Sequence, residues 1–229
     1  MKNNLFEESL LGRIYFRYFK NKKFSASDEF WEKRYQKGKD SGSGSYNRLA
    51  EFKAEVINNF VRKNNIQTII EFGCGDGNQL RLADYPNYIG LDVSKTTLQN
   101  CINIFRDDKT KSFMLYNSNA FVDNHNIIKA ELSMSLDVIY HLVEDSIFKP
   151  YMSHLFNSAS KYVIIYSSNR DNIQQSHVRE RNFSKWVDEN CKEWELAEVI
   201  KNKYPYDTMD PDNTSISDFF IYRRKKFQN

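Results

Sequence analysis

The chain has 229 residues, with 33 lysines and arginines against 30 aspartates and glutamates, which leaves a net charge of only +3. This length favours one domain with an attached segment, and 40% apolar and 15% aromatic residues supply a buried core, which excludes a generally disordered chain. The weak net charge does not indicate a nucleic-acid partner, and the three scattered cysteines favour neither a disulfide framework nor a metal site of the zinc type.

Residues 1–24 mix large apolar side chains with basic residues and are predicted to form an amphipathic helix. Glu7 and Glu8 dilute its charge, which favours packing on the domain, while contact with a membrane surface or a partner stays open. Nowhere in the chain is there an uninterrupted apolar stretch of bilayer length, and the start lacks the apolar region and cleavage site of a signal peptide. We therefore expect a cytoplasmic protein.

Residues 38–46, GKDSGSGSY, are the most loop-like part of the sequence because they are rich in glycine and serine. A flexible linker and a loop that closes over a ligand both fit this composition. We interpret residues 1–46 as a helical segment followed by a lid loop, with Tyr46 as a candidate substrate contact. Residues 47–229 then form the main domain.

Apolar residues recur at helical spacing from residue 47 to residue 63, which predicts a helix that faces the core. Short apolar or β-branched runs predict the strands that follow, at residues 68–72, 88–91, 132–136 and 162–166. Helix-like segments separate these strands, which is typical of a parallel sheet. Residues 196–200 and 219–222 predict a closing antiparallel pair.

The first predicted strand runs into a turn with glycine at every second position, TIIEFGCGDG, ending at Gly77. Glycine permits positive φ and lets a ligand approach the backbone, and a helix expected after the turn would offer free N–H groups. Asp92 ends the next strand, where its carboxylate can accept both hydroxyls of a ribose. A dinucleotide dehydrogenase prefers G-x-G-x-x-G, whereas this chain has G-x-G-x-G preceded by Glu71.

The turn resembles the first motif of the class I S-adenosylmethionine-dependent methyltransferases, E/D-x-G-x-G-x-G, at every fixed position from Glu71 to Gly77. The resemblance extends through Asp92 and residues 137–142 and covers the chain from about Phe30 onward. It implies an α/β, Rossmann-like fold with a seven-stranded, mostly parallel sheet, helices on both faces and an antiparallel last strand. It also implies S-adenosylmethionine (SAM) as the cofactor and S-adenosylhomocysteine (SAH) as its product. The implied cofactor residues are Glu71, Gly73, Cys74, Gly75, Gly77, Asp92, Val93, Asn119, Ala120 and Asp137.

Asn119 departs from the family pattern, which often has an acid followed by alanine near the adenine, whereas Ala120 matches the alanine. Two interpretations of Asn119 are equally open. Its amide could contact the adenine, or it could be an ordinary turn residue.

Methyl transfer from a sulfonium is an in-line displacement, so positioning comes first, and a hydroxyl acceptor also benefits from a general base. His141 is the candidate base because it follows the predicted strand at residues 132–136, at the ligand-binding edge of the sheet, and Tyr140 is the runner-up. A role in packing or in substrate contact would explain a histidine at position 141 equally well.

The loop after the predicted strand at residues 162–166 is basic, and its candidate substrate-binding residues are Arg170, His177, Arg179 and Arg181. Guanidinium groups favour phosphate and carboxylate, so this loop could hold an anionic acceptor. A solvated surface loop is the open alternative.

Residues 31–35, 41–46, 48–50, 137–145 and 166–169 together resemble a subgroup of small bacterial methyltransferases often encoded beside surface-polysaccharide genes. This resemblance implies O-methylation of a small anionic or sugar-type acceptor, such as a nucleotide-linked sugar or phosphorylated precursor in capsule modification. An RNA or protein methyltransferase and a non-catalytic SAM-binding module are the alternatives. Because the basic residues lie mainly at the termini and in one loop, we expect no nucleic-acid partner.

Overall fold

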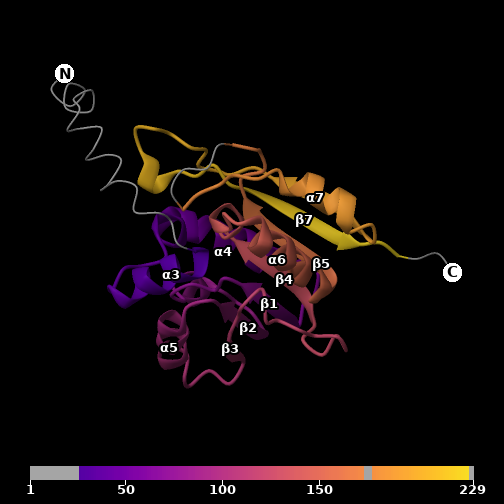
Figure 1. The fold of residues 1–229 in the computed structure, drawn as a ribbon, viewed down its shortest axis with the longest axis horizontal. Coiled ribbons are helices and arrows are strands. Elements are labelled where there is room, and N and C mark those ends of the chain that lie inside the picture. The colour runs from indigo at the N-terminus through magenta and orange to yellow at the C-terminus, as the bar shows by residue number, and fades with distance from the viewer. Residues whose placement is uncertain (1–25, 173–176, 227–229) are drawn as a thin grey trace.

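A seven-stranded sheet in the order β3-β2-β1-β4-β5-β7-β6 forms the centre of the computed structural model, which describes residues 26–172 and 177–226 (Figure 1). The strands are Thr68–Phe72 (β1), Asn87–Asp92 (β2), Lys111–Leu115 (β3), Ala130–Leu136 (β4), Ala159–Ser167 (β5), Trp194–Ile200 (β6) and Asp218–Arg224 (β7). Neighbours among β1 to β5 pair in parallel, whereas β7 is antiparallel to both β5 and β6. The predicted α/β fold with an antiparallel last strand is confirmed.

Helices cover both faces of the sheet. The α-helices are Ser27–Gln36 (α3), Asn47–Lys63 (α4), Lys95–Ile104 (α5), Asp145–Asn157 (α6) and Phe183–Asn190 (α7). Short 3₁₀ helices are Ser43–Ser45 (η2), Gln79–Leu82 (η3), Ile139–His141 (η4) and Pro211–Asn213 (η5).

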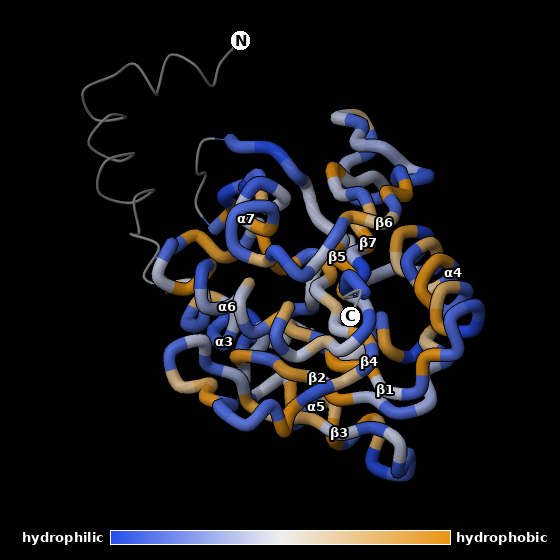
Figure 2. The backbone as a smooth tube through the Cα atoms, turned by 90° about the vertical axis from the view of Figure 1, so that its right-hand side faces the viewer, coloured by the Kyte–Doolittle hydropathy of each residue, from blue (hydrophilic) through white to orange (hydrophobic). Residues whose placement is uncertain are grey.

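The two cores follow from the alternation of side chains along each strand. On β1, Ile69 packs into the core that includes Ile57 of α4, and Ile70 packs into the opposite core with Met152 of α6. Coloured by hydropathy, the chain shows hydrophobic stretches along the central strands and alternating stretches along α4 (Figure 2). The amphipathic pattern of residues 47–63 therefore builds one face of the domain.

The helix expected directly after the glycine turn is absent, and that prediction is wrong. Residues 79–82 form only the short η3, and β2 begins at Asn87. Pro86 disfavours helical backbone in Tyr85 before it, so the short connection has no room for an α-helix. The turn therefore leads into a single 3₁₀ turn.

The N-terminal segment is described only in part, because the helix predicted over residues 1–24 lies outside the described residues. The following α3 is held by hydrogen bonds from Ser27 Oγ to Glu144 (2.6 Å) and from Ser94 Oγ to Glu32 (2.5 Å). These bonds fasten α3 over the ends of the strands, and the division at residue 46 stays a prediction. Within residues 26–172 and 177–226, no helix is long and apolar enough to cross a membrane.

Candidate functional site

The carboxyl ends of β3, β2, β1 and β4 line a cavity of about 410 Å³ that α3 and α4 help to enclose. Ligand pockets of proteins typically measure roughly 300–1,000 Å³, so the cavity has the size of a small-molecule or cofactor site. The predicted cofactor residues in its wall are Glu71, Gly73, Cys74, Gly75, Asp92, Val93, Asn119 and Asp137. Gly77 and Ala120 lie outside this wall.

The glycine turn requires glycine for two physical reasons. The φ angles of Gly73 and Gly75 are 84° and 58°, a region that other residues adopt at a cost in strain. A Cβ on Gly75 would also lie 2.5 Å from Ser41 Oγ, and one on Gly73 would lie 2.4 Å from a methyl carbon of Val138. The turn is therefore tightly packed by the loop before α4 and by the residue after Asp137.

Asp92 ends β2 beside this turn, as the sequence predicts. Its carboxylate accepts hydrogen bonds from the backbone N–H of Gly75 (3.0 Å) and of Ser94 (2.9 Å). Burial raises the pKa of Asp92 from 3.8 to about 6, although these backbone bonds oppose the shift. Asp92 thus braces the turn and presents a carboxylate to the cavity.

Glu71 is the buried acid that precedes the turn on β1. Its carboxylate accepts a hydrogen bond from the Tyr88 hydroxyl at 2.7 Å. Burial raises the pKa of Glu71 from 4.5 to about 7, while the Tyr88 bond and the charge of Lys53 oppose the rise. Its charge therefore changes near neutral pH, where a bound cation would favour the ionised form.

His141 ends η4 and lies in the cavity wall beyond β4. Its Nδ1 is 3.1 Å from the carbonyl oxygen of His177, which can only accept, so Nδ1 carries the proton and Nε2 is left as the acceptor. Burial lowers the pKa of His141 from 6.5 to about 4, although the bond to the His177 carbonyl opposes the change. The ring packs edge to face on Trp31, with centroids 4.9 Å apart. His141 is therefore a neutral, fixed hydrogen-bond acceptor.

Tyr140, the second candidate base, lies outside the cavity wall. Its hydroxyl donates to Asp137 Oδ1 at 3.0 Å, and burial raises its pKa well above the ordinary value, so it stays protonated. In this arrangement Tyr140 anchors Asp137, and a direct part in proton transfer stays a prediction.

The loop at residues 38–46 is fastened to the glycine turn by reciprocal bonds. The backbone N–H of Ser41 donates to Asp76 Oδ2 at 2.8 Å, and the backbone N–H of Asp76 donates to Ser41 Oγ at 2.9 Å. Tyr46 adds a bond from its hydroxyl to the same Asp76 oxygen at 2.9 Å, and Ser41 and Ser45 lie in the cavity wall. This position is compatible with a lid, and the lid role stays a prediction. Tyr46 itself lies outside the cavity wall, so its substrate contact also stays a prediction.

The basic residues of the loop after β5 pair with acids in this structure and lie outside the cavity wall. Arg170 binds Glu180 at 2.6 Å, and Arg179 and Arg181 bind Asp145 at 3.1 and 2.6 Å. Arg181 also donates to the carbonyl groups of residues 142 and 143. The predicted anion-binding role of these arginines, and a direct substrate contact of His177, stay predictions.

Several residues of the cavity wall were not assigned from the sequence. Trp31 and Tyr35 of α3 form part of the wall, as do Lys53 of α4 and Gln79 of η3. Lys53 carried a readable signal, because it lies three residues after Ala50 on the apolar stripe of its helix, where a charged side chain would be buried. The position of α3 had no such signal in the sequence, since it depends on contacts with residues that are distant in the chain.

One curated protein matches part of the sequence, and several solved structures share the fold. No protein-family model matches the chain. Over 108 residues it is 27% identical to a small RNA 2′-O-methyltransferase of Arabidopsis thaliana, a match that covers 42% of this chain but only 12% of that protein. The N-methyltransferase NodS of Bradyrhizobium japonicum WM9 in complex with SAH superposes with a TM-score of 0.69 at 11% identity, covering 88% of this chain and all of NodS.

A further solved structure with a similar fold is the methyltransferase domain of the bacterial protein CtHen1, with a TM-score of 0.59 at 15% identity over 76% of this chain and 97% of that domain. These likenesses show that the chain has the Rossmann-like methyltransferase fold. They also contradict the expectation that nucleic acid is not a partner, because the Arabidopsis relative is named for methylating small RNA. The weak net charge was a poor guide, since it says nothing about a short or local RNA contact.

Proposed function

We propose that the protein is a methyltransferase that takes the methyl group of SAM and transfers it to a hydroxyl of a sugar-type acceptor. The observation that carries this proposal is the grouping, around one cavity, of a positive-φ glycine turn, the Asp92 carboxylate and the neutral imidazole of His141. The first two suit a nucleoside cofactor, and the third suits a hydroxyl acceptor.

The cofactor would lie along the carboxyl ends of the strands. Asp92 would accept the ribose hydroxyls, Asn119 would lie near the adenine, and the backbone from Gly73 to Gly75 would approach the remainder. SAM supplies an electrophilic methyl group on a sulfonium. The buried carboxylates of Asp92 and Glu71 complement its positive charge.

His141 would hold the acceptor hydroxyl by accepting its hydrogen bond at Nε2. As the carbon–oxygen bond forms and the carbon–sulfur bond breaks, the hydroxyl proton passes to this nitrogen and neutral SAH is left. The low pKa keeps His141 unprotonated throughout the neutral range, so the acceptor site is available at any such pH.

A small anionic acceptor is our first candidate, such as a nucleotide-linked sugar or a phosphorylated precursor of a surface polysaccharide. The basic loop supports it, because the backbone N–H of Arg179 donates to the carbonyl of Tyr140 at 2.8 Å, next to His141. The Arg179 side chain is also 36% exposed, so its guanidinium can turn from Asp145 to an incoming anion.

The ribose 2′-hydroxyl of RNA is the second candidate, favoured by the sequence match to the Arabidopsis small RNA 2′-O-methyltransferase. The chemistry at His141 would be the same, because both acceptors offer a sugar hydroxyl. The two candidates differ in what binds around that hydroxyl.

A methyl-transfer assay with radiolabelled SAM tests the proposal and separates the candidates. The acceptor panel holds nucleotide-linked sugars, sugar phosphates, short RNAs, and the same RNAs with 2′-deoxy groups in place of the 2′-hydroxyls. Label in a sugar nucleotide supports the first candidate, and label that requires the 2′-hydroxyl supports the second. Calorimetry that detects no binding of SAM or SAH to the wild-type protein would contradict the proposal as a whole.

A further inference from the structure

Helix α3 covers part of the cavity and is fastened there by two of its side chains. In its first turn, Ser27 Oγ lies within hydrogen-bond distance of the carbonyl oxygen of His141, at 2.8 Å. In its second turn, the Glu32 carboxylate accepts a hydrogen bond from Thr96 Oγ1, at the start of α5, at 2.7 Å. Because these two contacts tie α3 to different elements, they fix which face of the helix is turned toward the cavity.

The cavity face of α3 carries Asp28, Trp31 and Tyr35. These residues are spaced by three and four positions, so they lie on one side of the helix, and all three belong to the cavity wall. Tyr35 is buried, and its hydroxyl lies 2.9 Å from Ser41 Oγ, which gives it a structural role. Asp28 is exposed and Trp31 is partly exposed, so packing in the core explains neither of them.

Asp28 is a carboxylate with spare capacity to accept hydrogen bonds. Its Oδ1 accepts the backbone N–H of Glu29 at 2.8 Å, and no ion pair engages it within residues 26–172 and 177–226. An acid in the first turn also favours the helix dipole. Glu29 already supplies that charge, however, and it pairs with Lys33 at 2.8 Å and lies outside the cavity wall. Asp28 is therefore placed to serve a ligand.

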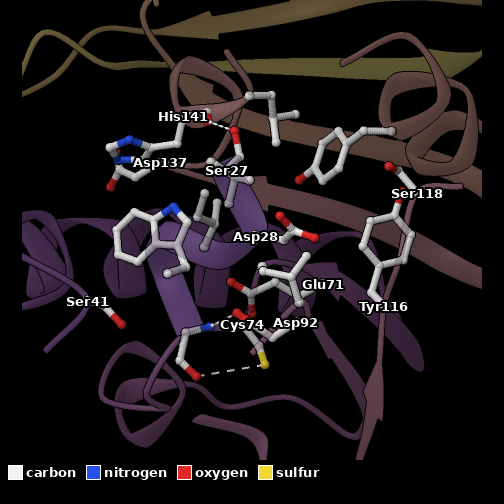
Figure 3. Close-up of a pocket in the computed structure, with 18 of the residues that line it drawn as sticks. Ser27, Asp28, Ser41, Glu71, Cys74, Asp92, Tyr116, Ser118, Asp137 and His141 are labelled. Carbon is white, nitrogen blue, oxygen red and sulfur yellow. Dashed lines mark hydrogen bonds between the residues drawn. The ribbon is translucent and has the colours of Figure 1, made fainter. Parts of the chain in front are cut away.

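Asp28 and Trp31 both lie beside His141, the proposed base. The Trp31 ring packs edge to face with the imidazole, with centroids 4.9 Å apart, and Ser27, which contacts the His141 carbonyl, directly precedes Asp28. Figure 3 shows Asp28 between Ser27 and Glu71, on the cavity side of α3. An acceptor hydroxyl held at His141 Nε2 therefore brings the remainder of its ring next to Trp31 and Asp28.

This pair of side chains matches the two kinds of surface that a sugar ring presents. C–H groups cover the faces of the ring and pack against an exposed aromatic side chain, whereas the hydroxyls at its rim donate to a carboxylate. The charge of Asp28 would repel a phosphate at the same place. A protonated amine would pair with Asp28, but it has no lone pair with which to attack a methyl group. An uncharged ring with several hydroxyls fits both side chains.

We propose that Trp31 and Asp28 form the acceptor subsite for an uncharged sugar ring, an inference that rests on the proposed function. Trp31 packs on one face of the ring. Asp28 accepts a hydrogen bond from a second hydroxyl, while the hydroxyl that becomes methylated donates to His141. Any phosphate of the acceptor lies away from Asp28.

The test measures how two uncharged probes, methyl β-D-glucopyranoside and methyl β-D-ribofuranoside, bind to the protein saturated with SAH. Saturation-transfer NMR is expected to detect the ring protons of at least one probe on the wild-type protein. Asp28→Asn should weaken its binding about 5- to 10-fold, because a charge-assisted hydrogen bond becomes a neutral one. Trp31→Ala should abolish binding, and Trp31→Phe should retain part of it. Glu29→Gln, in the same helical turn but outside the cavity wall, is the matched control and should bind as the wild type does.

A second set of probes tests the hydroxyl contact directly. The monodeoxy analogue that lacks the hydroxyl held by Asp28 should bind equally well to the wild type and to Asp28→Asn. If every monodeoxy analogue preserved the difference between the two proteins, Asp28 would contact no hydroxyl and the inference would be wrong. A preference for the glucoside supports a hexose as the ring, and a preference for the ribofuranoside supports a ribose.

Calorimetry with SAH separates this subsite from the cofactor site. Each variant should bind SAH within about twofold of the wild type, and a parallel loss of SAH and sugar binding in Asp28→Asn would overturn the inference. Unchanged sugar binding in Asp28→Asn or in Trp31→Ala would overturn it as well. So would a wild-type protein that binds SAH but neither sugar, a result that leaves the cofactor assignment intact. Failure of the wild type to bind SAH would instead refute the proposed function.

Discussion

Replacement of Asp92 by alanine is the most direct perturbation of the cofactor site. Asp92 is 6% exposed, and its carboxylate accepts backbone hydrogen bonds from Gly75 and Ser94 at 3.0 and 2.9 Å. In the proposed complex it also accepts the ribose hydroxyls, and a hydrogen bond to a charged group contributes about 1.5–3 kcal/mol. Two such bonds amount to at least about 3 kcal/mol, which corresponds to a loss of SAH affinity of roughly 100-fold or more.

Affinity for SAH, measured by calorimetry, is a sharper readout for this variant than stability. Alanine leaves two backbone N–H groups without their acceptor, but it also removes the unfavourable burial of a carboxylate whose pKa is raised to about 6. These effects on the free energy of unfolding partly cancel. Asp84→Ala, which removes an exposed carboxylate, is the control. An unchanged SAH affinity in a folded Asp92→Ala protein would refute the ribose assignment.

The remaining predictions concern the base, the acids, the loop and the basic rim. His141→Ala should lower kcat by about 10²- to 10⁴-fold with SAH affinity unchanged, and wild-type kcat should be flat from about pH 6 to 9 because the pKa of His141 is about 4. SAM affinity should rise from about pH 5 to 8, because the positively charged cofactor favours the ionised form of Glu71, whose pKa is about 7 in the free protein. Binding should therefore release protons, which calorimetry in buffers of different ionisation enthalpy should detect. Trypsin cleavage after Lys37 or Lys39 should slow when SAH is bound, and equal rates would restore the linker interpretation. Arg179→Ala should raise the KM for an anionic acceptor more than it changes kcat, and the reverse pattern would argue against its binding role.

The fold was predictable because its signals are local in the sequence. The helix over residues 47–63 and the strand over residues 68–72 have the predicted bounds, since buried faces leave a 3.6-residue period or an apolar run. The exception among the strands is β3, whose bounds were not predicted from the sequence. It is an edge strand with a largely exposed surface, and its sequence KSFML lacks an apolar run.

The cofactor turn was also predictable, because the glycines and Asp92 are tied to consecutive strands. The remainder of the wall was not, because it depends on pairs far apart in the chain. Lys53 and Asp137 are 84 positions apart, and Ser27 meets Glu144 across 117 positions. No local sequence pattern specifies such contacts. For the same reason, the ion pair between Arg181 and Asp145 could not be predicted from the sequence around Arg181.

The low pKa of His141 bears on how catalysis is divided between proton removal and positioning. An imidazole with a pKa of about 4 is too weak to ionise a sugar hydroxyl before the methyl group moves. As the carbon–oxygen bond forms, however, the oxygen becomes positive and its proton strongly acidic, so a weak base suffices if it is already in place. The rate then depends on where the ring is held, by the His177 carbonyl at 3.1 Å and by the edge-to-face contact with Trp31. On this argument the proposed contribution of His141 would depend on the packing of α3 and of the loop after β5, which hold a weak base in place for the acceptor proton.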